Sequence, residues 1–252
     1  MESLSVTIIT YNEGKDIRDC LESVKWADEI IIVDSFSTDK TVDICEEYTD
    51  KIYKEEWKGY ASQKNSAIDK AKSDWILSID ADEKVPNPLK EEIFSVLSSP
   101  NKKEGYFIAR KNFFCGRWIK HGGWYPDYTM RLFRKGKGRF PVREVHESAV
   151  VTGATGYLTN PLEHYTYQSV SDFLQRMNQY SSLSAQEYFH KGKRAKLIQI
   201  IFGPIFTFIR MYIIQRGFLD GYLGLLLSVL YSYYTFTKYA KLKELVDSHS
   251  PG

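Results

Sequence analysis

The chain has 252 residues, of which 43% are hydrophobic and 15% aromatic, and its formal net charge is +2. This length and composition allow a substantial buried core and exclude a disordered segment. The three cysteines Cys20, Cys45 and Cys115 form neither a close pair nor a zinc-binding spacing, which fits a reducing compartment better than a disulfide scaffold. The first residues lack the basic start of a signal peptide, so we expect a cytoplasmic protein.

Charge is distributed unevenly along the chain. Residues 1–100 contain 12 Lys or Arg and 22 Asp or Glu, whereas residues 101–252 contain 22 and 10. An acidic first part is compatible with binding a metal cation. A basic second part indicates an anionic partner, such as a phosphate, an acidic glycolipid or a membrane surface. A nucleic-acid partner is not expected, because no basic helix with base-reading or stacking motifs is present.

Strand and helix patterns alternate in the first hundred residues. Strands are predicted at residues 4–10, 29–35, 50–57 and 74–83, and helices at residues 15–27, 37–48, 59–72 and 86–99. Ser37 or Thr38 is available to cap the second helix. Strands and loops are expected at residues 105–165, followed by a helix at residues 169–190. This order predicts an α/β fold with a mostly parallel sheet, whose ligands bind beyond the carboxyl ends of the strands.

Two aspartates stand at one such strand end, in the motif Asp80-Ala-Asp82. Side chains two positions apart in a strand project to the same face, so both carboxylates can point at one cation. Mg²⁺ or Mn²⁺ commonly takes one or two carboxylates together with substrate phosphates. The alternative is a pair of solvated turn acids, which the ordered α/β frame makes less favoured.

These motifs resemble family 2 glycosyltransferases of the GT-A fold. The similar segments are VTIITYNEGKDIRDCLESV, IIVDSFSTDKT and QKNSAIDKAKSDWILSIDADE, which together span about the first 90 residues. Further along, GGWYPDYTMRLFRKGKGRF, VHE, the HYTY segment and GFLDG resemble the bacterial lipopolysaccharide-core β-glucosyltransferase branch. The resemblance implies a GT-A type, Rossmann-like, mostly parallel sheet with a helical C-terminal tail.

The resemblance also implies residues that bind a UDP-sugar donor. Thr10, Tyr11 and Glu13 correspond to the first loop around the base and ribose, where Tyr11 offers a stacking face or forms a rim aromatic. Asp34 corresponds to the acid that accepts a hydrogen bond from the uracil ring.

The two positions after Asp34 depart from the family pattern. Many members carry a second aspartate and a glycine where this chain has Ser35 and Phe36. Asp39 either belongs to this loop or only caps the following helix.

The resemblance assigns the diphosphate end of the donor to the next helix and strand. Lys64 corresponds to a basic residue near the diphosphate, and Asn65 is expected to buttress its helix against the metal strand. Asp80 is expected at the ribose or a metal-bound water, and Asp82 as a direct ligand of Mg²⁺ or Mn²⁺. Glu83 is either a supporting acid or a solvated turn acid.

An inverting transfer needs a general base beside the acceptor hydroxyl, and the candidates are Asp127, Glu144 and Glu147. Asp127 is favoured because residues 122–126 can shape a tight loop in front of it. Arg131 follows at a spacing that would let it steady this acid or a donor phosphate, or form a structural ion pair. His146 is a candidate third metal ligand or diphosphate donor, with a structural histidine as the alternative.

The tail from residue 191 contains two apolar stretches that do not form clean transmembrane helices. The first is interrupted by Gln199, Pro204 and Arg210, and the second by Asp220 after Arg216. Flanking basic residues and many tyrosines are typical of an interfacial helix, which would place the enzyme on the inner face of the cytoplasmic membrane. The alternative is packing on the catalytic domain or on a sister subunit in a homo-oligomer.

The expected organisation is a catalytic domain at residues 1–190, divided into a nucleotide-sugar half (1–100) and an acceptor half (101–190), followed by the tail at 191–252. The expected function is an inverting transfer of a sugar, glucose in particular, from a UDP-sugar to a hydroxyl of a lipopolysaccharide core or similar glycolipid. The alternatives are transfer to another surface polysaccharide or lipid carrier, and a sugar-nucleotide-binding protein without turnover. A nucleotidyltransferase is disfavoured, because TYNEG is not a glycine-rich basic phosphate loop.

Overall fold

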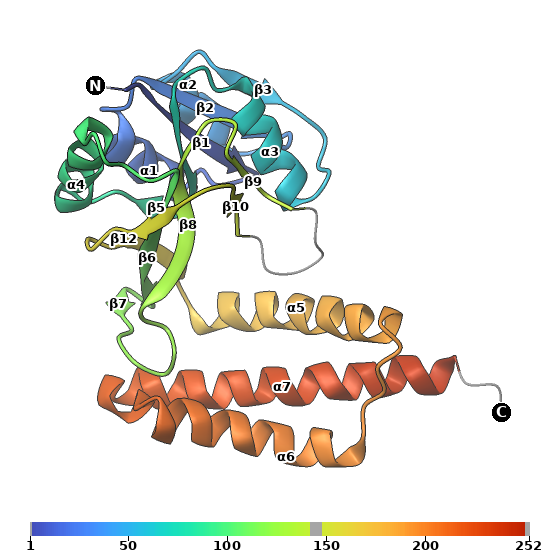
Figure 1. The fold of residues 1–252 in the computed structure, drawn as a ribbon. Helices are drawn as coiled ribbons and strands as arrows, with labels where there is room; N and C mark the ends of the chain where they lie inside the picture. Colours follow the sequence, from blue (N-terminus) through green and yellow to red (C-terminus); the bar gives the residue numbers. More distant parts are fainter. Residues whose placement is uncertain (1, 142–147, 250–252) are drawn as a thin grey trace. The chain divides into compact units, whose positions relative to one another are not determined.

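A computed structural model describes residues 2–141 and 148–249 (Figure 1). The chain divides into two compact units, the first made of residues 1–110 and 127–164 and the second of residues 111–126 and 165–252. The first unit contains most of a ten-stranded sheet with helices packed on it, and the second contains the C-terminal helices. The functional division expected at residue 190 stays a prediction.

Four parallel strands form the first part of the sheet, in the order β3-β2-β1-β4. They are β1 (Leu4–Thr10), β2 (Glu29–Asp34), β3 (Ile52–Lys54) and β4 (Trp75–Asp80). The helices between and after them are α1 (Ile17–Val24), α2 (Thr41–Glu46), α3 (Tyr60–Lys70) and α4 (Asn87–Ser98). The predicted βα alternation is therefore confirmed.

The sheet continues beyond β4 with antiparallel strands, in the order β8-β6-β12-β5. These are β8 (Asp127–Arg134), β6 (Gly105–Phe114), β12 (Leu162–Tyr167) and β5 (Glu83–Lys84). Short strands β7 (Arg117–Trp118) and β11 (Thr155–Tyr157) pair with β6, while β9 (Gly138–Arg139) and β10 (Val150–Val151) pair with each other. The expected single strand at residues 74–83 is thus two strands in different parts of the sheet.

Apolar side chains cover both faces of the parallel strands. On one face, Leu4, Val6 and Ile8 join a core that includes residues of α1 and α4. On the other face, Ile31 and Val33 join a core that includes residues of α3. Strands buried on both faces are almost continuously hydrophobic, as the sequence of β2 is. Each fully buried aliphatic side chain contributes about 1.5–3 kcal/mol, so these two cores fix the position of the strand ends.

Helix α2 begins later than its sequence pattern suggests. Ser37 donates its hydroxyl to Asp34 instead of capping the helix, and no side-chain cap bond is present at its N-cap, Lys40. Asp39 accepts hydrogen bonds from the backbone N–H groups of Gly14 and Thr41 at 3.0 Å each. The cap expected from Ser37 or Thr38 is therefore wrong, and Asp39 orders the helix start.

The second unit is built on three helices. They are α5 (Val170–His190), α6 (Leu197–Phe208) and α7 (Tyr222–Ser248), and α7 lies between the other two (Figure 1). A π-helical segment (Ile209–Ile214) and a 3₁₀ turn (Gly217–Asp220) connect α6 to α7. Aromatic rings fill the space between α5, α7 and the 111–126 segment; they include Phe114, Trp124, Tyr167, Phe173 and Tyr231.

Candidate active site

Three strands end side by side at the polar motifs that the sequence analysis singled out. Thr10 at the end of β1 is paired in register with Asp34 at the end of β2. On the other side of β1, Ile9 is paired with Asp80 at the end of β4. The strands β2 and β3 lie on one side of β1, and the later strand β4 lies on the other side, so the strand order reverses at β1. Ligands of α/β sheets bind at such a switch point.

Asp34 lies beneath the surface at this edge. Its carboxylate accepts hydrogen bonds from the Thr10 hydroxyl (2.9 Å) and from the backbone N–H (2.9 Å) and hydroxyl (2.5 Å) of Ser37. Asn12 joins the same network, since its N–H donates to Ser37 and its side-chain oxygen accepts from the N–H of Thr38. The loops that follow β1 and β2 are therefore held together, with Asp34 as their anchor.

Two aromatic rings project from these anchored loops. Tyr11 is 58% exposed and Phe36 is 53% exposed. Phe36 has a φ of 59°, a left-handed conformation that costs a non-glycine residue about 1 kcal/mol or more. A glycine would adopt this conformation without strain. An exposed ring kept in an unfavourable backbone conformation is a candidate for contact with a ligand.

Glu13 marks the end of the first of these loops. Its N–H donates to the Thr41 hydroxyl at 2.8 Å, and its carbonyl accepts from Asp16 and Ile17 at the start of α1. Its backbone therefore connects the β1 loop to both α1 and α2.

Asp80 is held between two cations. Its carboxylate forms ion pairs with Lys64 at 2.7 Å and with Arg131 at 2.6 Å, using one oxygen for each. Burial alone would raise the pKa of Asp80, but the charges of Arg131 and Lys64 outweigh it and hold that pKa well below its usual range. With both oxygens engaged in this way, Asp80 is less suited to direct metal ligation than Asp82.

Glu83 is fully buried, so the solvated-turn interpretation of this acid is wrong. One oxygen accepts from Arg131 at 2.5 Å, and the other accepts from the N–H of Asp80 at 2.9 Å. Burial raises the pKa of Glu83, and the charge of Arg131 opposes that rise. Arg131 thus joins Asp80 at the end of β4 to the buried Glu83 on β5.

Asp82 faces a histidine from a distant part of the chain. His164 on β12 places its Nε2 atom 3.4 Å from a carboxylate oxygen of Asp82, and it is paired in register with Glu83. Burial would lower the pKa of His164, but the facing carboxylate of Asp82 outweighs it and raises that pKa.

A carboxylate and an imidazole nitrogen are both ligands that Mn²⁺ or Mg²⁺ can take alongside donor phosphate oxygens. Within residues 2–141 and 148–249, no cluster of three or more such side chains could hold a metal by itself. The donor set of Asp82 and His164 therefore fits a cation that arrives with a diphosphate. His146, the expected third ligand, lies outside the described residues.

Asp127 begins β8 and is bound by Arg110 on the neighbouring strand β6. The guanidinium approaches one carboxylate oxygen with Nε at 2.9 Å and Nη2 at 2.6 Å. The side chain of Asp127 is about one third exposed, which leaves it accessible to a substrate. Arg110 also lies 3.9 Å from Glu83. Glu144 and Glu147, the other candidate bases, lie outside the described residues.

These contacts bear on two further expectations. Arg131 forms ion pairs with Asp80 and Glu83, in line with the structural ion-pair alternative, and its donor-binding role stays a prediction. Asn65 exchanges two hydrogen bonds with the backbone of Phe140, at 2.8 and 3.0 Å, and so buttresses α3 against that segment instead of β4.

Sequence reasoning did not find Arg110 and His164. Each reaches the site through antiparallel pairing between strands far apart in the chain, β6 with β8 and β12 with β5. The HYTY segment was noticed only as part of a resemblance, and no local spacing signals either residue as a site residue.

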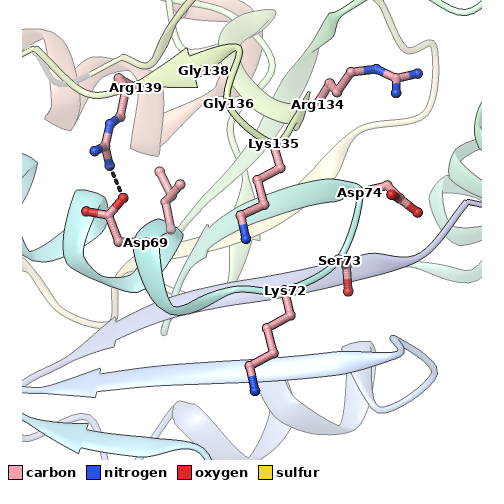
Figure 2. Close-up of a pocket in the computed structure, with 10 residues that line it drawn as sticks. Asp69, Lys72, Ser73, Asp74, Arg134, Lys135, Gly136, Gly138 and Arg139 are labelled. Carbon is pink, nitrogen blue, oxygen red and sulfur yellow. Dashed lines mark hydrogen bonds and ion pairs between the residues drawn. The ribbon is translucent and has the colours of Figure 1, made fainter.

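A pocket of about 590 Å³ lies elsewhere in the first unit, between the turn before β4 and the turn after β8 (Figure 2). Its residues flank Trp75, at the opposite end of β4 from Asp80. Several of its cations are already paired: Figure 2 shows Arg139 bound to Asp69, and Arg134 binds Glu2 and Glu104. This pocket is therefore not the site formed at the carboxyl ends of the strands.

An α/β sheet with paired acids at the carboxyl end of β4 is the arrangement expected of a GT-A type glycosyltransferase. Residues 5–166 match the family model Glycosyl transferase family 2. The chain belongs to this family, as its motifs suggested.

Relatives extend this likeness over nearly the whole chain. The lipopolysaccharide core biosynthesis glycosyltransferase LpsC of Rhizobium meliloti is 32% identical over 245 residues, which cover 93% of this chain and 91% of LpsC. The glycosyltransferase SunS of Bacillus subtilis is 46% identical over 84 residues, 32% of this chain and 20% of SunS. S. aureus TarS 1–349 in complex with UDP-GlcNAc shares the fold at a TM-score of 0.50 and 16% identity, covering 98% of this chain and 92% of that chain. The expected GT-A fold is confirmed.

The Arg131 ion pairs yield a stability prediction. Arg131→Met leaves the buried Glu83 without its closest cation and Asp80 with Lys64 alone, so we expect the free energy of unfolding to fall by about 3–5 kcal/mol in urea denaturation at pH 7. Arg139→Met, which removes an exposed ion pair with Asp69, is the matched control and should change it by about 0.5 kcal/mol or less. Similar losses in the two variants would contradict the structural role of Arg131.

The conformation of Phe36 yields a second prediction, read from a pair of variants. Phe36→Gly should be more stable than Phe36→Ala by about 0.4–1 kcal/mol, because only glycine adopts the left-handed conformation without strain. Both variants should bind UDP more weakly by about 1–3 kcal/mol if the ring stacks on the base. Thermal unfolding and isothermal titration measure the two effects, and unchanged UDP affinity in both variants would exclude the ring from the donor site.

Proposed function

We propose that the protein is a metal-assisted, inverting glycosyltransferase that moves a sugar, with glucose as the expected one, from a UDP-sugar to a hydroxyl of a lipopolysaccharide core or related glycolipid. The observation that carries the proposal is the group at the end of β4, where Asp80 is fixed by two cations and Asp82 faces His164. LpsC, named for lipopolysaccharide core biosynthesis, supports the acceptor class. The UDP-GlcNAc complex of TarS supports a uridine donor.

In this proposal the donor lies across the ends of β1, β2 and β4. The loops that Asp34, Thr10 and Glu13 hold in place present the rings of Tyr11 and Phe36 to the base. Asp82 and His164 would hold Mg²⁺ or Mn²⁺, which when bound supplies positive charge for the departing diphosphate.

Lys64 and Arg131 have a different part in the proposed donor site. Both are largely buried and paired with Asp80, so they fix the orientation of that carboxylate toward the ribose. They also supply positive charge behind the acidic motif, which lowers the cost of bringing a diphosphate to this edge.

Asp127 is the proposed general base. Its carboxylate takes the proton of the acceptor hydroxyl while that oxygen attacks the anomeric carbon from the face opposite the diphosphate, and the bond from that carbon to the diphosphate oxygen breaks. Arg110 keeps the carboxylate oriented through two contacts to one oxygen. Asp127 has further interactions within the protein, and the acceptor would join or replace them.

The proposed location is the cytoplasmic face of the inner membrane, where a glycolipid acceptor is anchored. The basic C-terminal region supports this location, as does the apolar segment Leu197–Ile214, which is long and apolar enough to cross a membrane by length and composition. A homo-oligomer formed through the C-terminal helices is the alternative.

Asp82→Ala tests the metal assignment. We expect it to abolish the increase in UDP affinity that Mn²⁺ causes in the parent protein, because the carboxylate ligand is lost. Isothermal titration of UDP with and without Mn²⁺ measures the effect, with Asp69→Ala, an exposed acid away from the site, as the control. An undiminished response to Mn²⁺ in Asp82→Ala would exclude this residue as a ligand.

Asp127→Asn tests the base separately from the donor site. The amide keeps the size of the side chain but cannot accept the proton, so kcat should fall by about 10²–10⁴ while UDP affinity is retained. UDP release with extracted core glycolipid and a panel of UDP-sugars measures turnover, and Tyr128→Phe is the neighbouring control. A kcat near that of the parent enzyme would rule out the base role, and UDP binding without turnover on any acceptor by the parent protein would instead favour a binding protein.

A further inference from the structure

An apolar stripe runs along α6 and its π-helical extension. Its residues recur four positions apart, in adjacent pairs except at 209–210, where the exposed Arg210 stands beside Ile209, and their exposed fractions lie between 44% and 67%. Met211 is the one buried residue of segment 197–214. A core helix of comparable apolarity would be mostly buried, so this stripe lacks the partner that its composition requires. The stripe consists of Leu197, Ile198, Ile201, Phe202, Ile205, Phe206, Ile209, Ile213 and Ile214.

The opposite side of α6 is already in contact with α7. Thr207 and Thr235 share a hydrogen bond between their hydroxyls at 3.0 Å. A methyl group added at Gly203 would stand 3.3 Å from the side chain of Thr235, so the two helices approach closely there. The contact with α7 uses the small residues of α6 and leaves its large apolar residues outside.

The charges around the stripe favour an anionic partner. Residues 191–243 contain nine Lys or Arg and a single acid, Asp220. That acid is buried, and its carboxylate accepts from the backbone N–H groups of Lys120 and His121. A second copy of the chain would bring like charges together, whereas an anionic lipid surface would neutralise them. The exposed basic residues Lys193, Arg194 and Lys196 directly precede the stripe.

We propose that α6 and residues 209–214 lie flat in the interface of an anionic lipid bilayer, with the stripe inserted and the basic residues at the headgroups. This inference deepens the membrane location proposed above and rests on it, but its test needs no sugar transfer. Interfacial helices combine an apolar face with basic residues at the headgroup level in this way.

The contacts at the two ends of the α6–α7 hairpin argue against its crossing the bilayer. At the turn, the N–H of Gly122 donates to the carbonyl of Gln215 at 2.9 Å, and His121 donates to Asp220 at 2.8 Å. At the other end, Lys241 on α7 donates to the carbonyl of Asn178 on α5 at 2.9 Å. If the hairpin crossed the bilayer, it would have to break one of these two sets of contacts, or the segments that make them would have to enter the hydrocarbon with it.

Helix α5 adds to this argument, because it packs along α7 on the side away from α6. Polar residues are exposed on α5, and they could not enter hydrocarbon without a large cost. A flat orientation of α6 leaves α5 in water. The exposed polar residues are Gln175, Arg176, Asn178, Gln179 and Gln186.

Vesicle flotation tests the stripe and its preference for anionic lipid. The full-length protein should float with vesicles containing phosphatidylglycerol and much less with phosphatidylcholine alone. Ile201→Glu with Phe206→Glu should lower the partition on the order of a hundredfold. Leu174→Glu with Leu183→Glu, two exposed apolar residues of α5, is the matched control and should float like the parent.

All flotation variants are first shown to bind UDP like the parent protein, so that loss of flotation is not loss of folding. Equal flotation of the α6 and α5 double variants would overturn the assignment of the stripe. The assignment would also be overturned if the parent protein did not float with vesicles and instead formed dimers, seen in sedimentation velocity, that the α6 double variant abolished. Normal flotation without sugar transfer would overturn the proposed function and leave this inference standing.

Insertion depth separates a flat helix from a spanning one. Ile205 lies at the middle of segment 197–214, so Ile205→Cys in a Cys115→Ser background gives a single exposed labelling position, since Cys20 and Cys45 are buried. A fluorophore there should be quenched more strongly by nitroxides near the lipid headgroup than by nitroxides near the bilayer centre. Stronger quenching from the centre would show a spanning helix and overturn the flat orientation.

Discussion

The buried guanidinium of Arg131 is the interaction on which the rest of the site depends. It comes from β8 and binds Asp80 at the end of β4 and the fully buried Glu83 on β5. Without this cation Glu83 would have to be protonated or leave the interior, and Asp80 would keep only its ion pair with Lys64. The same contacts tie the antiparallel part of the sheet to the end of the parallel part, and therefore position Asp82.

The charges around Arg131 alternate in sign from one end of the site to the other. Lys64 binds Asp80, Arg131 binds Asp80 and Glu83, and Arg110 lies near Glu83 and binds Asp127. Each of these carboxylates is thus held by a lysine or arginine side chain on a neighbouring element. A change at one of these ion pairs would alter the charge balance at its neighbours, so Asp80 and Asp127 are electrostatically connected within the first unit.

The parallel strands were predictable because their signals are local: apolar runs of strand length, helical spacing between them, and polar residues where the strands end. Asp80 and Asp82 could be found for the same reason. His164 and Arg110 could not, because they reach the site through pairing of strands separated by up to 80 residues, which local patterns do not encode. The helix at α2 was predicted, but its start was placed too early, because the Ser37 hydroxyl binds Asp34 three residues before it, a local side-chain bond that replaces its capping role.

The two units differ in how their charged and apolar side chains are placed. In the first unit, acids that would repel one another are held by Arg131, Lys64 and Arg110, and such preorganised charges lower the reorganisation needed when a charged ligand binds. In the second unit, apolar side chains stay exposed along α6 with basic residues beside them. Exposure of such an apolar stripe to water is unfavourable, whereas a lipid surface would cover the stripe and neutralise the charges beside it.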